Sequence, residues 1–222
     1  MKKVLILCLL VVVGGLQLLA QTCPMGDIVL TSQQEIDDFA ATYPGCTSLQ
    51  YDLKIRETIP GDITSLAGLS QLTEVAGYVF IDATTSLTSL SGLDNLTAIY
   101  NNLSLYDNES LVDLTGLENL TLIGGDLRLI SNLALTSVDG LNSLGLVGGD
   151  VNIADQQQLN SLAGMESLTS VGGKFRLYTN PVLQNLAGLE NLSAIGTDLE
   201  LSDNPALASI AQLSSFTSLG GS

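Results

Sequence analysis

Apolar residues recur along most of the chain with a period of 24 residues. One, four and seven residues after a recurring glycine the chain is apolar, as at Leu117, Leu120 and Ile123. An alternating apolar pair follows, such as Leu127 and Leu129, and a second pair three residues apart closes each repeat. The recurring glycine occupies positions 68, 92, 116, 140, 164 and 188. A fixed period of this length is typical of a repeat architecture.

A single repeat cannot bury its apolar side alone, so the repeats are expected to stack as the coils of a solenoid around one continuous core. The alternating pair has the period of two that a strand with one buried face requires. Repeated once per coil, this strand builds a long parallel sheet, whereas the other apolar positions predict short strands or tight turns. The pattern therefore predicts a mostly β fold, a β-solenoid with 24-residue coils.

The first 20 residues have the layout of a secretory signal peptide, with Lys2 and Lys3, an apolar stretch over 4–19 and the small Ala20. A membrane anchor is the alternative, but an apolar run of 16 residues that contains glycine and glutamine is shorter than the roughly 20 residues needed to span. We therefore expect residues 1–20 to be a signal peptide and the mature chain to have no integral membrane span.

Residues 21–46 lie outside the 24-residue register and predict an N-terminal cap, with the solenoid over 47–222. Cys23 and Cys46 bracket this segment, and an exported protein is where such a pair forms a disulfide. DIVLT predicts a strand, and Ser32 and Glu35 have the spacing of a capping box that opens a short helix before Pro44. At the other end a further coil begins at position 212 and stops at GGS, so the solenoid is expected to be truncated there.

The charge balance limits the classes of partner that the protein can bind, because the chain has 7 basic and 23 acidic side chains and a net charge of −16. Loss of residues 1–20 removes Lys2 and Lys3, which leaves 5 basic against 23 acidic side chains and a net charge of −18. Nucleic acid and anionic membrane surfaces are poor partners for such a chain. Histidine is absent, which excludes imidazole general bases and histidine metal sites.

The cap CPMGDIVLTSQQEIDDFAATYPGCTSL, followed by units such as GLENLTLIGGDLRLISNLALTSVDGL, resembles the receptor L domain of secreted proteins from Bacteroidetes-type bacteria. The resemblance covers 23–222 and implies a right-handed β-solenoid, related to leucine-rich repeats, with a non-catalytic binding role. L domains of animal growth-factor receptors hold polypeptide ligands. Internalin-type leucine-rich repeats are the nearest alternative, but the extra GGD lengthens each coil beyond their spacing.

Candidate binding residues lie on the strand positions that flank the inward pair, because alternation turns these side chains to solvent. All five basic residues that follow the signal peptide lie on this strand or, for Lys174, one step before its inward pair. Arg and Tyr are enriched in binding hot spots, although exposed strand positions also accept them without any binding role. The candidates on this face are Lys54, Arg56, Phe80, Tyr106, Arg128, Ile130, Lys174, Arg176 and Tyr178.

Two further recurrences are not assigned as sites. The asparagines at 108, 132, 180 and 204 predict a stacked turn ladder, because Asn tolerates turn geometry and bonds to nearby backbone. The aspartates at 126, 150 and 198 suggest calcium, but they lack the tight ligand spacing of known calcium loops. We assign no metal, cofactor or catalytic residue.

The sequence thus predicts a secreted or cell-surface bacterial binding module, non-enzymatic, that recognises a protein or carbohydrate ligand on its sheet face. A structural or adhesive repeat without a discrete site is the first alternative. A β-helix polysaccharide-degrading enzyme is the second, with Lys174 or Arg176 and neighbouring carboxylates as candidates. No inserted loop interrupts the repeats to build a cleft for it.

Overall fold

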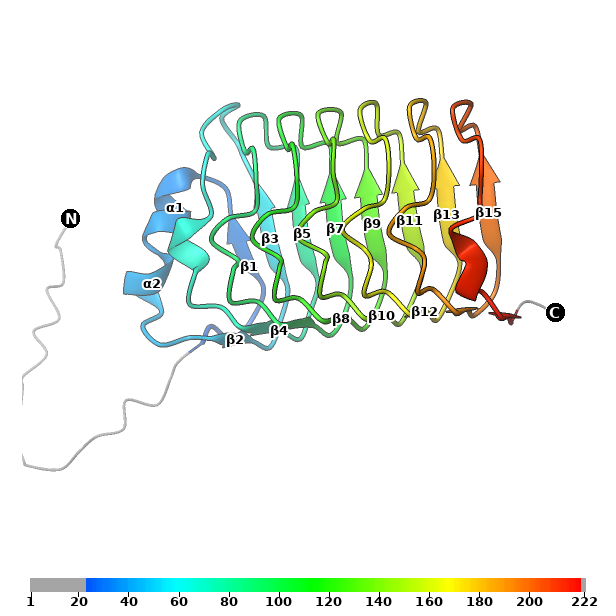
Figure 1. Ribbon diagram of the computed structural model, residues 1–222. Coiled ribbons are helices and arrows are strands. Elements are labelled where there is room, and N and C mark those ends of the chain that lie inside the picture. Colours follow the sequence, from blue (N-terminus) through cyan, green and yellow to red (C-terminus); the bar gives the residue numbers. More distant parts are fainter. Residues whose placement is uncertain (1–22, 221–222) are drawn as a thin grey trace, which may run out of the picture.

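The computed structural model describes residues 23–220, so the expected signal peptide lies outside the described residues. The chain forms a parallel β-solenoid in which each coil stacks on the one before it (Figure 1). Two parallel sheets of eight strands each run along the described part, one built from long strands and the other from short ones. The expectation of a mostly β solenoid is confirmed. None of the helices within 23–220 has the length and apolar character to cross a membrane.

The long sheet contains the odd-numbered strands in sequence order (Figure 1). Its strands are β1 (Ile28–Leu30), β3 (Leu53–Arg56), β5 (Val79–Asp82), β7 (Leu103–Tyr106), β9 (Leu127–Ile130), β11 (Val151–Ala154), β13 (Phe175–Tyr178) and β15 (Leu199–Ser202). From β5 onward each residue pairs with the residue 24 positions later, as Leu127 pairs with Val151. The period in the sequence is therefore the step from one coil to the next.

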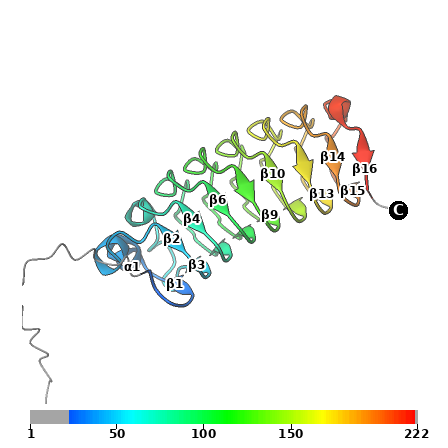
Figure 2. The same cartoon turned by 90° about the horizontal axis from the view of Figure 1, so that it is seen from below.

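The short sheet contains two-residue strands, and each strand from β2 to β14 is separated by three residues from the long strand that follows it (Figure 2). These are β2 (Ser48–Leu49), β4 (Glu74–Val75), β6 (Ala98–Ile99), β8 (Leu122–Ile123), β10 (Leu146–Val147), β12 (Ser170–Val171), β14 (Ala194–Ile195) and β16 (Ser218–Leu219). Single 3₁₀ turns, η1 (Ala67–Leu69) and η2 (Leu213–Ser215), occur in an early and a late coil. Short strands at these apolar positions match the sequence expectation.

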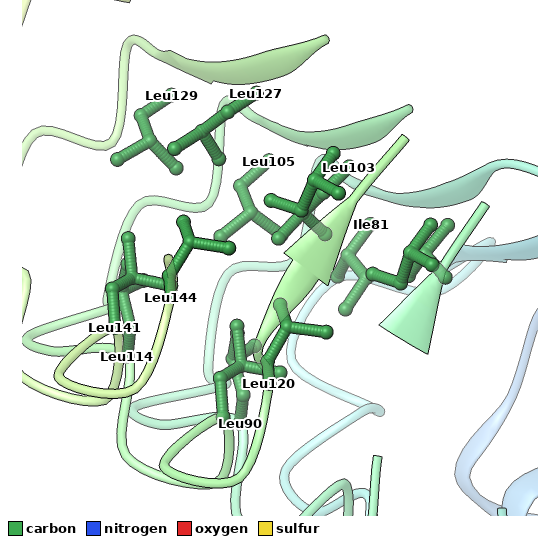
Figure 3. Packing of buried hydrophobic residues seen from close by; sticks show 14 of the residues in the cluster. Ile81, Leu90, Leu103, Leu105, Leu114, Leu120, Leu127, Leu129, Leu141 and Leu144 are labelled. Carbon is green, nitrogen blue, oxygen red and sulfur yellow. The ribbon is translucent and has the colours of Figure 1, made fainter. Parts of the chain in front are cut away.

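The core consists of columns of apolar side chains, each column taking one residue from every coil (Figure 3). Leu103 and Leu105 of β7 lie beside Leu127 and Leu129 of β9, and all four are fully buried. Leucines from the opposite side of each coil, such as Leu120, close the same interior. Each interior side chain packs against the equivalent side chains of the coils before and after it. Packing therefore explains all seven apolar positions of a repeat.

A ladder of buried asparagines joins the coils behind the long strands, which confirms the expected stack. Asn132 donates from Nδ2 to the carbonyl of Leu105 at 3.0 Å. Its Oδ1 accepts from the backbone N–H of Asn108 at 3.2 Å and from Nδ2 of Asn108 at 3.0 Å. Asn180 makes the same bonds with Asn204, while Gln156 occupies the position between. Each amide thus satisfies backbone groups that the turn leaves without a strand partner.

The N-terminal segment covers the first coil with β1 and two short helices, α1 (Gln33–Asp37) and α2 (Phe39–Thr42), where the sequence predicted one helix. Ser32 caps α1 by accepting from the N–H of Glu35, as the capping box requires. The Glu35 carboxylate, however, accepts from the N–H of Thr31 rather than from that of Ser32. Ile36 and Phe39 are buried against the core, so the helices exclude water from its open end.

The predicted disulfide joins Cys23 to Cys46 across this segment, with the Cα atoms 4.9 Å apart. Replacing both cysteines by serine is expected to lower the free energy of unfolding by about 3 kcal/mol, because the unfolded chain regains the entropy of a closed loop. Urea unfolding of the variant and of the parent measures the difference. An unchanged unfolding midpoint would show that the cap holds without its covalent link.

Candidate functional site

The outer face of the long sheet, the side turned away from the core, carries two rows of side chains in register. The first row is half-buried over most of its length and consists of Val29, Lys54, Phe80, Ser104, Arg128, Asn152, Arg176 and Glu200. The second consists of Arg56, Asp82, Tyr106, Ile130, Ala154, Tyr178 and Ser202. Every candidate residue except Lys174 lies in one of these rows, and Lys174 immediately precedes β13.

Two positions of the second row are buried, although strand alternation predicts that they face solvent. The guanidinium of Arg56 covers the carboxylate of Asp82 and bonds to it through Nε and Nη2. Ala154 lies in register between Ile130 and Tyr178, and both of these neighbours have longer side chains than its methyl group. Neighbouring coils, rather than the strand's own pattern, therefore decide how far these side chains are exposed.

The basic residues near the C-terminal end of the outer face are held in a network of ion pairs. Arg176 lies 3.0 Å from both Asp150 and Glu200. Lys174 lies 2.9 Å from Asp198 and 3.0 Å from Glu200. The hydrogen bond to Asp198, followed by that to Glu200, raises the pKa of Lys174, and Lys174 in turn lowers the pKa of Glu200. These two cations are neutralised within the protein and offer little charge to a ligand.

A second cluster of charges lies at the other end of the face. Lys54 bonds to Asp27 at 2.7 Å and lies 3.0 Å from Asp52, and its pKa is raised by these two carboxylates in that order. The same contact with Lys54 lowers the pKa of Asp27. Arg128 pairs with Asp126 of its own coil. With Arg56, every Lys and Arg side chain within 23–220 thus has a carboxylate partner.

A shallow depression of about 340 Å³ lies on the outer face across β3, β5, β7 and β9, and we call it the face hollow. It is lined by Lys54, Tyr78, Phe80, Asn102, Ser104 and Arg128. Three of the candidates, Lys54, Phe80 and Arg128, are brought together here from three different coils. The other six candidates do not line the hollow.

Tyr78, Asn102 and Ser104 line the face hollow but are not among the candidates from the sequence. Tyr78 occupies the position that precedes the inward pair, where later coils have Asp126 and Asp150. Tyr78 is 41% exposed and stands where those coils have a carboxylate. A tyrosine at a repeat position that holds Asp, Asn or Lys in the other coils was a signal that the sequence already contained.

The polar groups of the hollow differ in how much of their bonding capacity is used. The Oδ1 atom of Asn102 accepts from the backbone N–H of Asp126 at 2.7 Å, as Oδ1 of Asp126 does for Asp150 in the next coil. Within 23–220, neither the Nδ2 group of Asn102 nor the hydroxyl of Ser104 has a hydrogen-bond partner. Donors and an acceptor are therefore available beside two aromatic rings.

The recurring aspartates serve the backbone rather than a metal centre. Asp126 and Asp150 each accept an N–H of the following coil through Oδ1 and bind Arg128 or Arg176 through Oδ2. Across the described residues, no group of three or more acidic or cysteine side chains is arranged to hold a metal ion. The GGD motif is explained by the contact between coils.

Two larger depressions lie away from the outer face. One of about 460 Å³ separates β1 from the cap helices, and one of about 630 Å³ lies beside Leu201, Leu207 and two prolines in the last coils. Neither contains a basic residue or a candidate from the sequence. The face hollow alone among the three combines basic, aromatic and amide side chains.

Comparison with known proteins gives one family match, in which the model of the receptor L domain matches residues 45–112. No curated protein and no solved structure gives a significant match. The matched segment contains β2 to β7 and five of the six residues that line the face hollow, all but Arg128. Receptor L domains are binding domains rather than enzymes, so the match supports a ligand-binding role for this part of the solenoid.

Proposed function

We propose that the protein is a non-enzymatic binding module of the cell exterior that holds a protein or glycan ligand on the outer face, with the face hollow as its centre. The observation that carries the proposal is the convergence of Tyr78, Phe80, Asn102, Ser104 and Arg128 on one depression. Tyr and Arg are enriched in binding hot spots, and ligand sites combine aromatic side chains with a few polar groups. The disulfide between Cys23 and Cys46 is compatible with the exterior.

The face hollow lies on β3 to β9, whereas the basic candidates Lys174 and Arg176 lie at β13. Lys174 and Arg176 were the most conspicuous candidates, but three carboxylates already occupy them. A ligand anion would have to displace those carboxylates, so this end of the face contributes little affinity. The hollow needs no such displacement, because Phe80 and Tyr78 present carbon surface directly to solvent.

The proposal is tested with a double variant, Tyr78→Ala with Phe80→Ala, screened against arrays of peptides and glycans. Loss of two central aromatic anchors is expected to weaken binding about 30-fold or more, because a single hot-spot side chain already contributes about 2 kcal/mol. Tyr106→Ala and Tyr178→Ala are matched controls, since both remove a tyrosine of the same face outside the hollow.

The controls are expected to bind as the parent does. Equal losses in the controls and in the double variant would contradict a discrete site, and would favour a repetitive adhesive surface. Cleavage of a polysaccharide by the purified protein would overturn the non-enzymatic assignment. Far-ultraviolet circular dichroism of each variant checks that the solenoid remains folded.

A further inference from the structure

The chemistry of the face hollow narrows the class of ligand. Phe80 is half-buried in β5, and Tyr78, which directly precedes that strand, is well exposed. The hollow thus offers aromatic rings together with the hydroxyl of Ser104 and the Nδ2 group of Asn102, both without partners within 23–220. A pyranose ring has one face of C–H groups and a rim of hydroxyls. Flat carbon surface flanked by donors and acceptors matches both features.

Charge disfavours an acidic ligand at the same place. The two cations of the hollow, Lys54 and Arg128, are already paired with Asp27, Asp52 and Asp126, so this group has three carboxylates for two cations. The chain as a whole has a net charge of −16. An anion that approached the hollow would meet an excess of negative charge and would compete with bonds that are already formed.

The guanidinium of Arg128 retains donors for a neutral ligand. Asp126 engages Nη2, whereas Nε and Nη1 bond to no other group in the described part of the chain. A hydroxyl can accept from these N–H groups without displacing the carboxylate. The size also agrees, since about 340 Å³ lies at the lower end of the range for sites of small molecules.

We propose that the face hollow binds a neutral sugar unit, either alone or as one residue of a longer neutral glycan. Phe80 and Tyr78 stack against the C–H face of the ring. Ser104, Asn102 and Arg128 bond to its hydroxyls. This inference rests on the proposed function and adds the chemical class of the ligand.

Isothermal titration calorimetry of the purified protein tests the inference with neutral oligosaccharides of glucose, mannose and N-acetylglucosamine, and with oligogalacturonate as an acidic sugar of similar size. At least one neutral oligosaccharide is expected to bind, and oligogalacturonate is expected to bind at least tenfold more weakly. Phe80→Tyr keeps a flat ring and is expected to retain binding. Phe80→Leu keeps apolar bulk without the ring and is expected to lose about tenfold or more.

Ser104→Ala removes a hydroxyl that bonds to no other described residue and is expected to weaken sugar binding without changing thermal stability. Tighter binding of oligogalacturonate, equal binding by Phe80→Leu, or no binding of any neutral oligosaccharide at millimolar concentration would overturn the sugar assignment. A peptide that binds the parent and is lost in Phe80→Ala would overturn it as well, but would leave the proposed function intact. Binding that is insensitive to every variant of the hollow would contradict both.

Discussion

Replacing Gly140 by alanine is expected to lower the free energy of unfolding by about 4 kcal/mol, through backbone strain and a steric clash together. Gly140 has a φ of +109°, a conformation that side chains with a Cβ rarely adopt. A Cβ atom there would lie 2.0 Å from the carbonyl oxygen of Leu114 in the preceding coil. Because that oxygen belongs to the backbone, relief requires that two coils separate.

Gly145→Ala is the matched control, since it makes the same change in the same coil. Gly145 does not have a positive φ, and a Cβ there would find its nearest neighbours at 3.8 and 3.9 Å, which is ordinary contact. Its effect is expected to stay below about 1 kcal/mol. Urea unfolding of both variants decides the matter. Equal losses would mean that the recurring glycine is not a requirement of coil stacking.

Replacing Asn132 by alanine is expected to cost about 4 kcal/mol, because it leaves buried backbone groups without partners and opens a cavity. Asn132 is fully buried. In the variant, the carbonyl of Leu105 and the backbone N–H of Asn108 lose the hydrogen bonds that Asn132 provides. Because the Asn132 side chain is fully buried, we expect hydration to offset little of this penalty.

Asn204→Ala provides the control at the last described rung of the same ladder. Asn204 bonds to Leu177 and Asn180 in the same way, but its side chain is only half-buried. Water can replace part of those bonds, and the expected loss is about 1 kcal/mol. Thermal unfolding followed by circular dichroism compares the two. A larger loss for Asn204→Ala than for Asn132→Ala would contradict the role assigned to burial.

Most of the fold could be predicted from the sequence because each structural requirement recurs at a fixed place in every coil. The inward pair at Leu127 and Leu129 identifies a strand and its buried side at once, and the repeat identifies its neighbours. The asparagine ladder was predictable for the same reason, since a polar residue that recurs at one position beside a turn is expected to make the same backbone hydrogen bonds in every coil. The one predicted helix of the cap is two helices in the structure, with Asp38 as the C-cap of α1 and the N-cap of α2.

The candidate site was less predictable, because it depends on differences between coils rather than on what they share. The face hollow lies where Phe80 stands in register between Lys54 and Ser104. How far each of these side chains extends from the sheet depends on packing between coils. The ion pairs that neutralise Arg176 join three coils, and the sequence pattern does not tell which carboxylate each cation selects. Alternation placed the candidates on the outer face but could not tell which were accessible.

The central claim is that one discrete part of the outer face, the hollow around Phe80, binds the ligand. Amide chemical shifts of the ¹⁵N-labelled protein, followed during titration with the tightest-binding oligosaccharide or peptide from the screens, test it most directly. The account predicts that the largest shifts cluster at Tyr78, Phe80, Asn102, Ser104 and Arg128. Shifts centred on the short sheet, on the cap, or on Lys174 and Arg176, with the residues of the hollow unchanged, would contradict it.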